Sequence, residues 1–149
     1  MDIKIELIIV GQLFVAFLLG AIIGFEREKH GNAAGIRTYA AVTLGAALFT
    51  LIGVHSPDAT ASGRIVANIV TGIGFLGAGI IYKDSTKGLT LGLTTASTVW
   101  AAAAIGVAVA YNMYIIAVAA TAVIYFLLDL HHFHWYIHLK DKWSKTQNH

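Results

Sequence analysis

Residues 88–128 read GLTLGLTTASTVWAAAAIGVAVAYNMYIIAVAATAVIYFLL and contain no charged side chain. A helix needs about 20 mainly apolar residues to cross a bilayer, so this stretch is long enough for two helices. Only the short connection Tyr111-Asn112 separates its two halves. The stretch therefore predicts an antiparallel pair of transmembrane helices over about residues 91–109 and 113–130.

Three further uncharged stretches precede this one, and each can hold one spanning helix. Their bounding charged residues are Glu6 and Glu26, Arg37 and Asp58, and Arg64 and Lys83. The spans that we predict within them are about 7–25, 38–54 and 65–82. The apolar runs do not alternate with a period of two, as the strands of a membrane barrel would. Residues 1–130 therefore predict an all-α, polytopic membrane protein, a compact bundle of about five transmembrane helices.

The composition supports this class and argues against others. Only 12% of the 149 residues are charged, against roughly 25% in soluble domains. The 57% share of hydrophobic residues argues against disorder, and a net charge of +2 gives no basic patch for nucleic acid. The chain has no cysteine, which excludes disulfides and thiolate sites. The first apolar run exceeds the core of a signal peptide, so we interpret it as a span.

The positive charges predict how the bundle is oriented. Eight of the ten Lys and Arg residues fall on one side, in the first loop, the third loop and the tail: Arg27, Lys29, Arg37, Lys83, Lys87, Lys140, Lys142 and Lys145. Lys4 and Arg64 fall on the other side. Since basic loops stay in the cytoplasm, we expect the N-terminus outside and the C-terminus inside.

Glycines predict close helix packing in the third span, where residues 72–79 read GIGFLGAG. The spacing matches a dinucleotide fingerprint, but no strand–turn–helix context surrounds it. On a helix, Gly72 and Gly79 share one face, and Gly74 and Gly77 fall nearly opposite. We therefore expect this helix to be the most enclosed element, with neighbours on two sides.

Two weaker GxxxG spacings, at Gly20 to Gly24 and Gly88 to Gly92, are consistent with packing inside the chain or in a homodimer. The candidate packing glycines are Gly20, Gly24, Gly72, Gly74, Gly77, Gly79 and Gly92.

Charged residues border the first loop closely enough to need partners. Glu26, Arg27 and Glu28 follow the first span, and Arg37 precedes the second. We favour an ion pair between these helix ends, formed by Glu26 with Arg37. The alternative is a solvated loop. Arg64 and Lys83, at the ends of the third span, are further candidates for a functional polar role.

Asn68, Thr94 and Thr95 are candidates for an interior polar site. An amide such as that of Asn68 must find partners in lipid. For the two threonines, we favour hydroxyl hydrogen bonds to carbonyls of their own helix. A place in the interior polar site is the alternative for them.

Residues 131–149 form a short tail rich in histidine and aromatic residues. His131, His134 and His138 have a helical spacing that could bind Zn²⁺ or Ni²⁺. We favour an amphipathic segment at the cytoplasmic membrane interface, since aromatic and basic residues alternate there. No metal site and no cofactor is predicted with these residues.

Several blocks in order resemble the MgtC/SapB family. They are Gly24-Phe25-Glu26-Arg27-Glu28, Ala34-Gly35-Ile36-Arg37-Thr38, Arg64-Ile65-Val66, residues 72–79, and Gly92-Leu93-Thr94-Thr95-Ala96 through Trp100 to Gly106. The resemblance implies a bacterial inner-membrane protein with about five spans and an outside N-terminus, in agreement with the charge distribution. This chain departs from the founding member at Thr94, where that member carries asparagine. We also expect this chain to lack the founding member's C-terminal soluble domain.

The resemblance also implies a function. Members support growth in low Mg²⁺ and survival in macrophages, and the founding member is thought to restrain the F1Fo ATP synthase. We therefore expect a non-enzymatic regulator, linked to magnesium homeostasis and virulence, that acts through contacts with other membrane proteins. No nucleophile or metal constellation indicates an enzyme.

A small oligomeric transporter or channel for Mg²⁺ or another cation is the alternative. Its support is the polar set Gln12, Asn68, Thr71, Thr94 and Thr95. Against it, no carboxylate lies in the middle of a span, and Mg²⁺ gives up its waters reluctantly. In either case we expect a homodimer or other homo-oligomer in the lipid bilayer, with no nucleic-acid partner.

Overall fold

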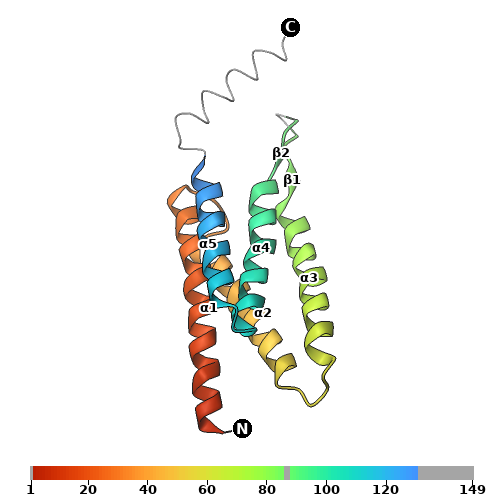
Figure 1. Ribbon diagram of the computed structural model, residues 1–149. Coiled ribbons are helices and arrows are strands. Elements are labelled where there is room, and N and C mark those ends of the chain that lie inside the picture. The colour runs from red at the N-terminus through yellow and green to blue at the C-terminus, as the bar shows by residue number, and fades with distance from the viewer. Residues whose placement is uncertain (1, 86–87, 131–149) are drawn as a thin grey trace.

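The computed structural model describes residues 2–85 and 88–130. The described part contains the helices α1 (Ile3–Lys29), α2 (Ile36–Val54), α3 (Ala61–Ile80), α4 (Leu93–Ala110) and α5 (Tyr114–Asp129). Two short strands, β1 (Tyr82–Lys83) and β2 (Thr90–Leu91), join α3 to α4 as an antiparallel pair (Figure 1). The tail candidates His131, His134 and His138 lie outside the described residues.

The helices form one bundle in which consecutive helices run in opposite directions (Figure 1). This confirms the predicted all-α membrane fold. The helices α1 to α4 are long and apolar enough to cross a membrane, while α5 is apolar but has 16 residues. The α1–α2 loop, the β1–β2 pair and the C-terminal end of α5 lie at one end of the bundle, which we call the loop end (Figure 1).

The first helix begins earlier than the hydropathy predicts because Asp2 caps it. The Asp2 side chain accepts a hydrogen bond from the Lys4 backbone N–H at 3.1 Å, and Asp2 is the N-cap residue of α1. The helix then continues to Lys29, past the predicted end at residue 25. The charged residues Glu26, Arg27 and Glu28 are therefore part of α1 and are not in the loop.

Glycine lets α1 and α2 approach closely. A Cβ on Gly20 would lie 2.6 Å from the Tyr39 carbonyl oxygen and would also collide with the Thr43 hydroxyl. A Cβ on Gly24 would lie 2.5 Å from the Ile36 Cα. Gly20 and Gly24 therefore serve packing between two helices of the same chain, and not packing in a homodimer.

A second close approach, between α2 and α4, depends on Gly106. A Cβ there would collide with the Thr43 carbonyl group, whose carbon would lie 3.0 Å away. Gly106 is not among the packing glycines predicted from the sequence. Gly92, which is among them, lies at the end of β2 with φ +88°, in close contact with the Ile80 carbonyl. Its role is a left-handed turn that redirects the chain into α4.

The expectation that the third span is the most enclosed is wrong for the single chain. Only 6% of the apolar stretch of α3 is buried inside the bundle, against 44% for α2 and 50% for α4. A Cβ added to Gly72, Gly74 or Gly79 would meet nothing within 4 Å, and one on Gly77 would make ordinary contact with Ala96. The physical reason is that, among the described residues, α5 packs against α1 and α4, which leaves α2 and α4 as the main neighbours of α3.

The buried amide of Gln12 joins the α4–α5 turn to α1. Its Nε2 donates to the carbonyl oxygens of Val109 and Ala110 at 3.2 and 3.3 Å, and to the Asn112 side chain at 3.2 Å. The last carbonyls of a helix have no partner within it, and in lipid no water replaces one. Gln12 is therefore a structural cap for α4 and not part of an open polar path.

The close approach at Gly20 generates the first prediction. Gly20→Ala should destabilise the bundle by about 1–3 kcal/mol, because the added methyl group meets backbone that cannot move aside. The matched control is Gly11→Ala on the same helix, where an added Cβ meets nothing within 4 Å. This control should leave stability unchanged or raise it by up to about 1 kcal/mol. Reversible SDS unfolding of both variants in mixed micelles provides the measurement, and equal stabilities would contradict the packing.

Candidate functional site

Two charged side chains are buried among the described residues, Glu26 at 2% exposure and Arg27 at 8%. They are neighbours near the C-terminal end of α1, at the loop end of the bundle. Burying a charge is costly unless hydrogen bonds or an opposite charge compensate it. Their partners therefore define the candidate functional site, which we call the polar cluster: Glu26, Arg27, His30, Asn32, Tyr39, Thr95 and Thr98.

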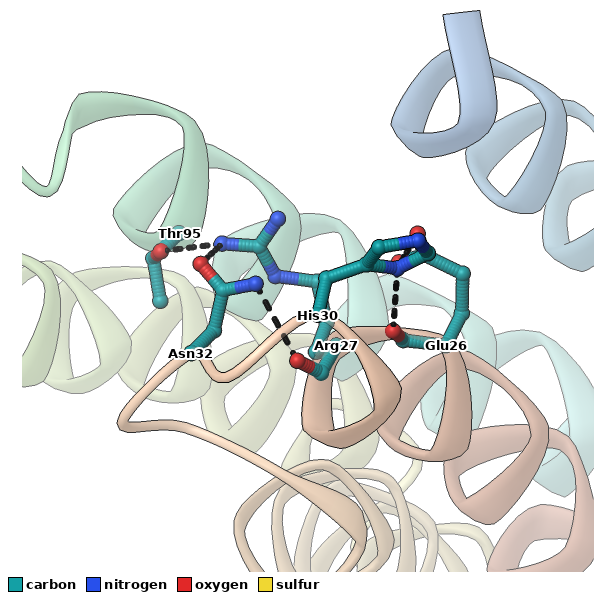
Figure 2. A network of polar contacts seen from close by, with 5 residues as sticks. All are labelled: Glu26, Arg27, His30, Asn32 and Thr95. Carbon is teal, nitrogen blue, oxygen red and sulfur yellow. Dashed lines mark hydrogen bonds and ion pairs between the residues drawn. The ribbon is translucent and has the colours of Figure 1, made fainter. Parts of the chain in front are cut away.

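The guanidinium of Arg27 connects three parts of the chain. One terminal nitrogen donates to the Asn32 side-chain oxygen at 2.6 Å and to the Thr95 hydroxyl at 2.7 Å (Figure 2). The Asn32 amide donates back to the Arg27 carbonyl at 3.1 Å. Thr95 lies in the first turn of α4 and Asn32 in the α1–α2 loop. Hydrogen bonds from an ionised donor are the stronger kind, so this contact fixes α4 and the loop against α1.

A second link, between α2 and α4, involves the Tyr39 hydroxyl. It lies 2.6 Å from the Thr98 hydroxyl, and both residues are buried. Thr98 also donates to the Thr94 carbonyl at 2.9 Å, within its own helix. With Tyr39 as donor to Thr98, both hydroxyl protons are used. The three helices α1, α2 and α4 are thus joined to one another at the loop end.

Glu26 pairs with His30, one turn further along α1, and not with Arg37. Its Oε1 lies 2.8 Å from His30 Nδ1, and this contact is an ion pair when the imidazole is protonated. The predicted ion pair between Glu26 and Arg37 is therefore wrong, since it does not occur among the described residues. The spacing of four residues brings His30 onto the same face of the helix, whereas Arg37, the second residue of α2, lines a cavity with Glu28.

Two atoms of the polar cluster are buried without a hydrogen-bond partner among the described residues. They are Oε2 of Glu26 and Nε of Arg27. Buried polar atoms in native proteins are normally satisfied. The polar cluster therefore has unused hydrogen-bonding capacity beside a fixed guanidinium, which is the arrangement expected of a site that takes a further polar group.

Glu28 and Arg37 line a separate polar cavity of about 450 Å³ at the loop end. The cavity is lined by Glu28, Asn32, Ala33, Gly35, Arg37 and Thr38. The Glu28 carboxylate accepts a hydrogen bond from the Ile36 backbone N–H at 3.0 Å, and it thereby caps the positive N-terminal end of α2. Asn32 contributes to both this cavity and the polar cluster.

The remaining candidates lie elsewhere. Arg64, in the first turn of α3, forms an exposed ion pair at 2.6 Å with Asp58 of the α2–α3 loop. Hydrogen bonds from Thr60 and the Arg64 guanidinium hold the pKa of the Asp58 carboxyl below its ordinary value. Asn68, in α3, and Lys83, in β1, are exposed and form no described hydrogen bond with the polar cluster, and Thr94 contributes only its carbonyl.

The structure thus brings Glu26, Arg27 and Thr95 together and adds residues that our sequence analysis missed. His30 could have been found from its spacing to Glu26 on a continuous helix. Tyr39, Thr98 and Asn32 carry no such signal, because their partners lie on other elements. Within residues 2–85 and 88–130, no group of three His, Asp or Glu side chains is placed to hold a metal ion.

The bond between Arg27 and Thr95 leads to the second prediction. Thr95→Val keeps the shape of the side chain and removes the acceptor, so it should cost about 1.5–3 kcal/mol, as expected for a hydrogen bond to a charged group. Arg27→Lys should destabilise the protein less than Arg27→Ala but more than no substitution, since an ammonium cannot reach Asn32 and Thr95 with the same planar geometry. A double-mutant cycle of Arg27→Ala and Thr95→Val, measured by SDS unfolding, should give a coupling energy. Strict additivity would show that the bond contributes nothing.

The third prediction concerns the partner of Glu26. A cycle of Glu26→Gln with His30→Ala should show a coupling of about 0.5–3 kcal/mol, because the two side chains are in contact. The matched cycle of Glu26→Gln with Arg37→Ala should be additive within about 0.5 kcal/mol. Coupling to Arg37 without coupling to His30 would reverse the assignment.

Comparison with known proteins gives one consistent result. A family model described as the MgtC family matches residues 13–134, which include the whole polar cluster. The chain is 48% identical to a protein named Protein MgtC from Salmonella typhimurium over 114 residues, covering 76% of this chain and 48% of that one. It is also 48% identical to Protein MgtC from Brucella abortus over 92 residues, covering 62% of this chain and 38% of that one. The chain therefore matches about half or less of the length of these relatives. No solved structure matches it.

Proposed function

The chain belongs to the MgtC family, and on that premise we propose that it is a non-enzymatic regulator in the bacterial inner membrane. Its long apolar helices make it a multi-pass membrane protein. We further propose that the loop end faces the cytoplasm and the N-terminus lies outside. The basic residues Arg27, Lys29, Arg37 and Lys83 support this orientation, since their segments meet at one end of the bundle (Figure 1).

The observation that carries this proposal is how Arg27 is used. Its guanidinium is held by Asn32 and Thr95 and joins α4 and the first loop to α1. A conduit would need such polar groups to line a continuous path across the bilayer. The polar cluster instead makes one end of the bundle rigid. A rigid cytoplasmic end with a polar surface is suited to contact with a larger complex.

We propose that the target is another membrane complex, with the ATP synthase as the first candidate, and that the regulation serves growth under Mg²⁺ limitation and virulence. The support is the family to which the chain belongs together with the rigid loop end. A partner that approaches from the membrane would meet apolar helices below this end and charged residues such as Glu28 and Arg37 on it.

The fourth prediction tests this action on the ATP synthase. Inverted membrane vesicles that contain the chain should show less ATP-driven proton uptake than vesicles without it, measured by quenching of a pH-sensitive dye. Thr95→Val should weaken the inhibition, because it loosens the loop end. Ser97→Ala is the matched control, since this exposed hydroxyl bonds only to the Leu93 carbonyl of its own helix. Equal proton uptake with and without the chain would remove the ATP synthase as target.

The transporter alternative is distinguished by flux. Purified protein in liposomes should release no more Mg²⁺ than empty liposomes if the chain is only a regulator. Flux that the wild type supports and Thr95→Val abolishes would overturn the regulator proposal and favour transport through the polar cluster.

A further inference from the structure

Asn68 lies in the eighth position of α3 and carries a polar amide on an exposed part of a membrane span. At 1.5 Å per residue, it lies about 10 Å along the helix axis from Ala61. No hydrogen bond to its side chain exists among the described residues, in contrast to Gln12, whose amide has three contacts. Lipid chains offer no hydrogen-bonding group, so the amide needs a partner from another protein surface.

The residues around Asn68 form a face that backbone can approach. On a helix, Gly72, Phe75 and Gly79 lie within about 40° of Asn68, and the buried residues Ile73 and Gly77 lie on the opposite side. Added Cβ atoms at Gly72 and Gly79 would meet nothing, and Phe75 is 82% exposed. We call these four residues, Asn68, Gly72, Phe75 and Gly79, the Asn68 face.

A groove of about 550 Å³ runs beside the Asn68 face, between α2 and α3. Its lining includes Gly45 and Phe49 from α2, and Asn68, Gly72 and Leu76 from α3. An added Cβ at Gly45 or Gly72 would be in open space. The groove therefore has one polar group, at Asn68, in an otherwise mainly apolar surface that can receive side chains from a neighbouring helix.

We propose that the Asn68 face and this groove form the interface of a two-fold homodimer, in which α3 of each copy lies against α3 and the groove of the other. Two copies inserted in the same direction are related by an axis along the membrane normal, so equal residues meet at equal depth. An amide both donates and accepts hydrogen bonds. Asn68 and Asn68 of the partner subunit therefore satisfy each other.

A second copy fits this surface better than the other possible occupants. An acyl chain fills the groove but leaves the amide unsatisfied. A different protein must carry a polar side chain at the same depth and a shape that matches, whereas a second copy supplies both by symmetry. Gly72 and Gly79 then allow the two α3 helices to approach closely. The homodimer does not depend on which complex the protein regulates, so the two proposals can fail separately.

The native chain has no cysteine, so single cysteines report this interface directly. Asn68→Cys, Gly72→Cys and Gly79→Cys should each form a disulfide-linked dimer on oxidation in native membranes, because disulfides require Cα atoms within about 7 Å. The controls are Val70→Cys on another face of α3 and Ile115→Cys on α5, both exposed positions. They should stay monomeric. Yields are compared at equal amounts of membrane-inserted protein.

Equal cross-linking at positions 68 and 70, or none at 68, 72 and 79, would overturn the homodimer. A cross-linked product at position 68 whose mass differs from that of two copies would show that a different protein occupies the face, and would also overturn the homodimer.

A second measurement keeps the test independent of cysteine chemistry. Asn68→Leu should raise the dissociation constant of the dimer in bilayers about 5–30-fold, the range expected for a polar interhelical contact, as measured by fluorescence transfer between labelled copies. Asn68→Gln retains a self-complementary amide and should lose less. Val70→Leu also introduces a leucine on α3 but keeps an apolar side chain at its position, so as the control it should leave the dissociation constant unchanged. An unchanged constant for Asn68→Leu would contradict the role of the amide.

Discussion

The buried guanidinium of Arg27 determines how the loop end of this bundle is built. A charge at the end of a span must have hydrogen-bond acceptors from the protein, because lipid provides none. Asn32 and Thr95 provide them, and this requires that the first loop folds back and that α4 begins beside the end of α1. The close approach of α1 to α2 at Gly20 and Gly24 holds the same helices together further along. Charge satisfaction and backbone packing thus specify one arrangement of α1, α2 and α4.

The fold could be predicted from the sequence because every backbone polar group inside the bilayer must be hydrogen-bonded within the protein. Long uncharged stretches must be helices, since only a helix satisfies its own backbone in lipid. The four long spans follow directly. The helix ends differ from the approximate span limits where local chemistry overrides hydropathy: Asp2 caps α1 at its start, and Gly92 forms a turn between β2 and α4. Strands of two residues are too short to leave a pattern.

The polar cluster could be predicted only in part. Glu26 and Arg27 were found because charges beside an apolar run are expensive and therefore noticeable. Their partners were not found, because the residue that faces a charge across a loop depends on how the helices rotate about their axes. The sequence placed Arg37 near Glu26, but α1 continues to Lys29 and presents His30 instead. Tyr39 and Thr98 meet only because α2 and α4 pack side by side.

The two amides inside the spans, Gln12 and Asn68, show how the need for hydrogen-bond partners in lipid extends beyond one chain. Gln12 is satisfied by the carbonyls that end α4, and it lies on α1, which packs closely against α2 at Gly20 and Gly24. Asn68 has no hydrogen-bond partner among the described residues and lies on α3, where an added Cβ at Gly72, Gly74 or Gly79 would meet nothing within 4 Å. In both cases an amide and glycines occur on one helix, but only those of α1 find their neighbours within the chain, at α4 and α2. Because an amide and exposed backbone in lipid both favour a close protein contact, the next contact of this bundle is expected at α3 rather than at α1 or α5.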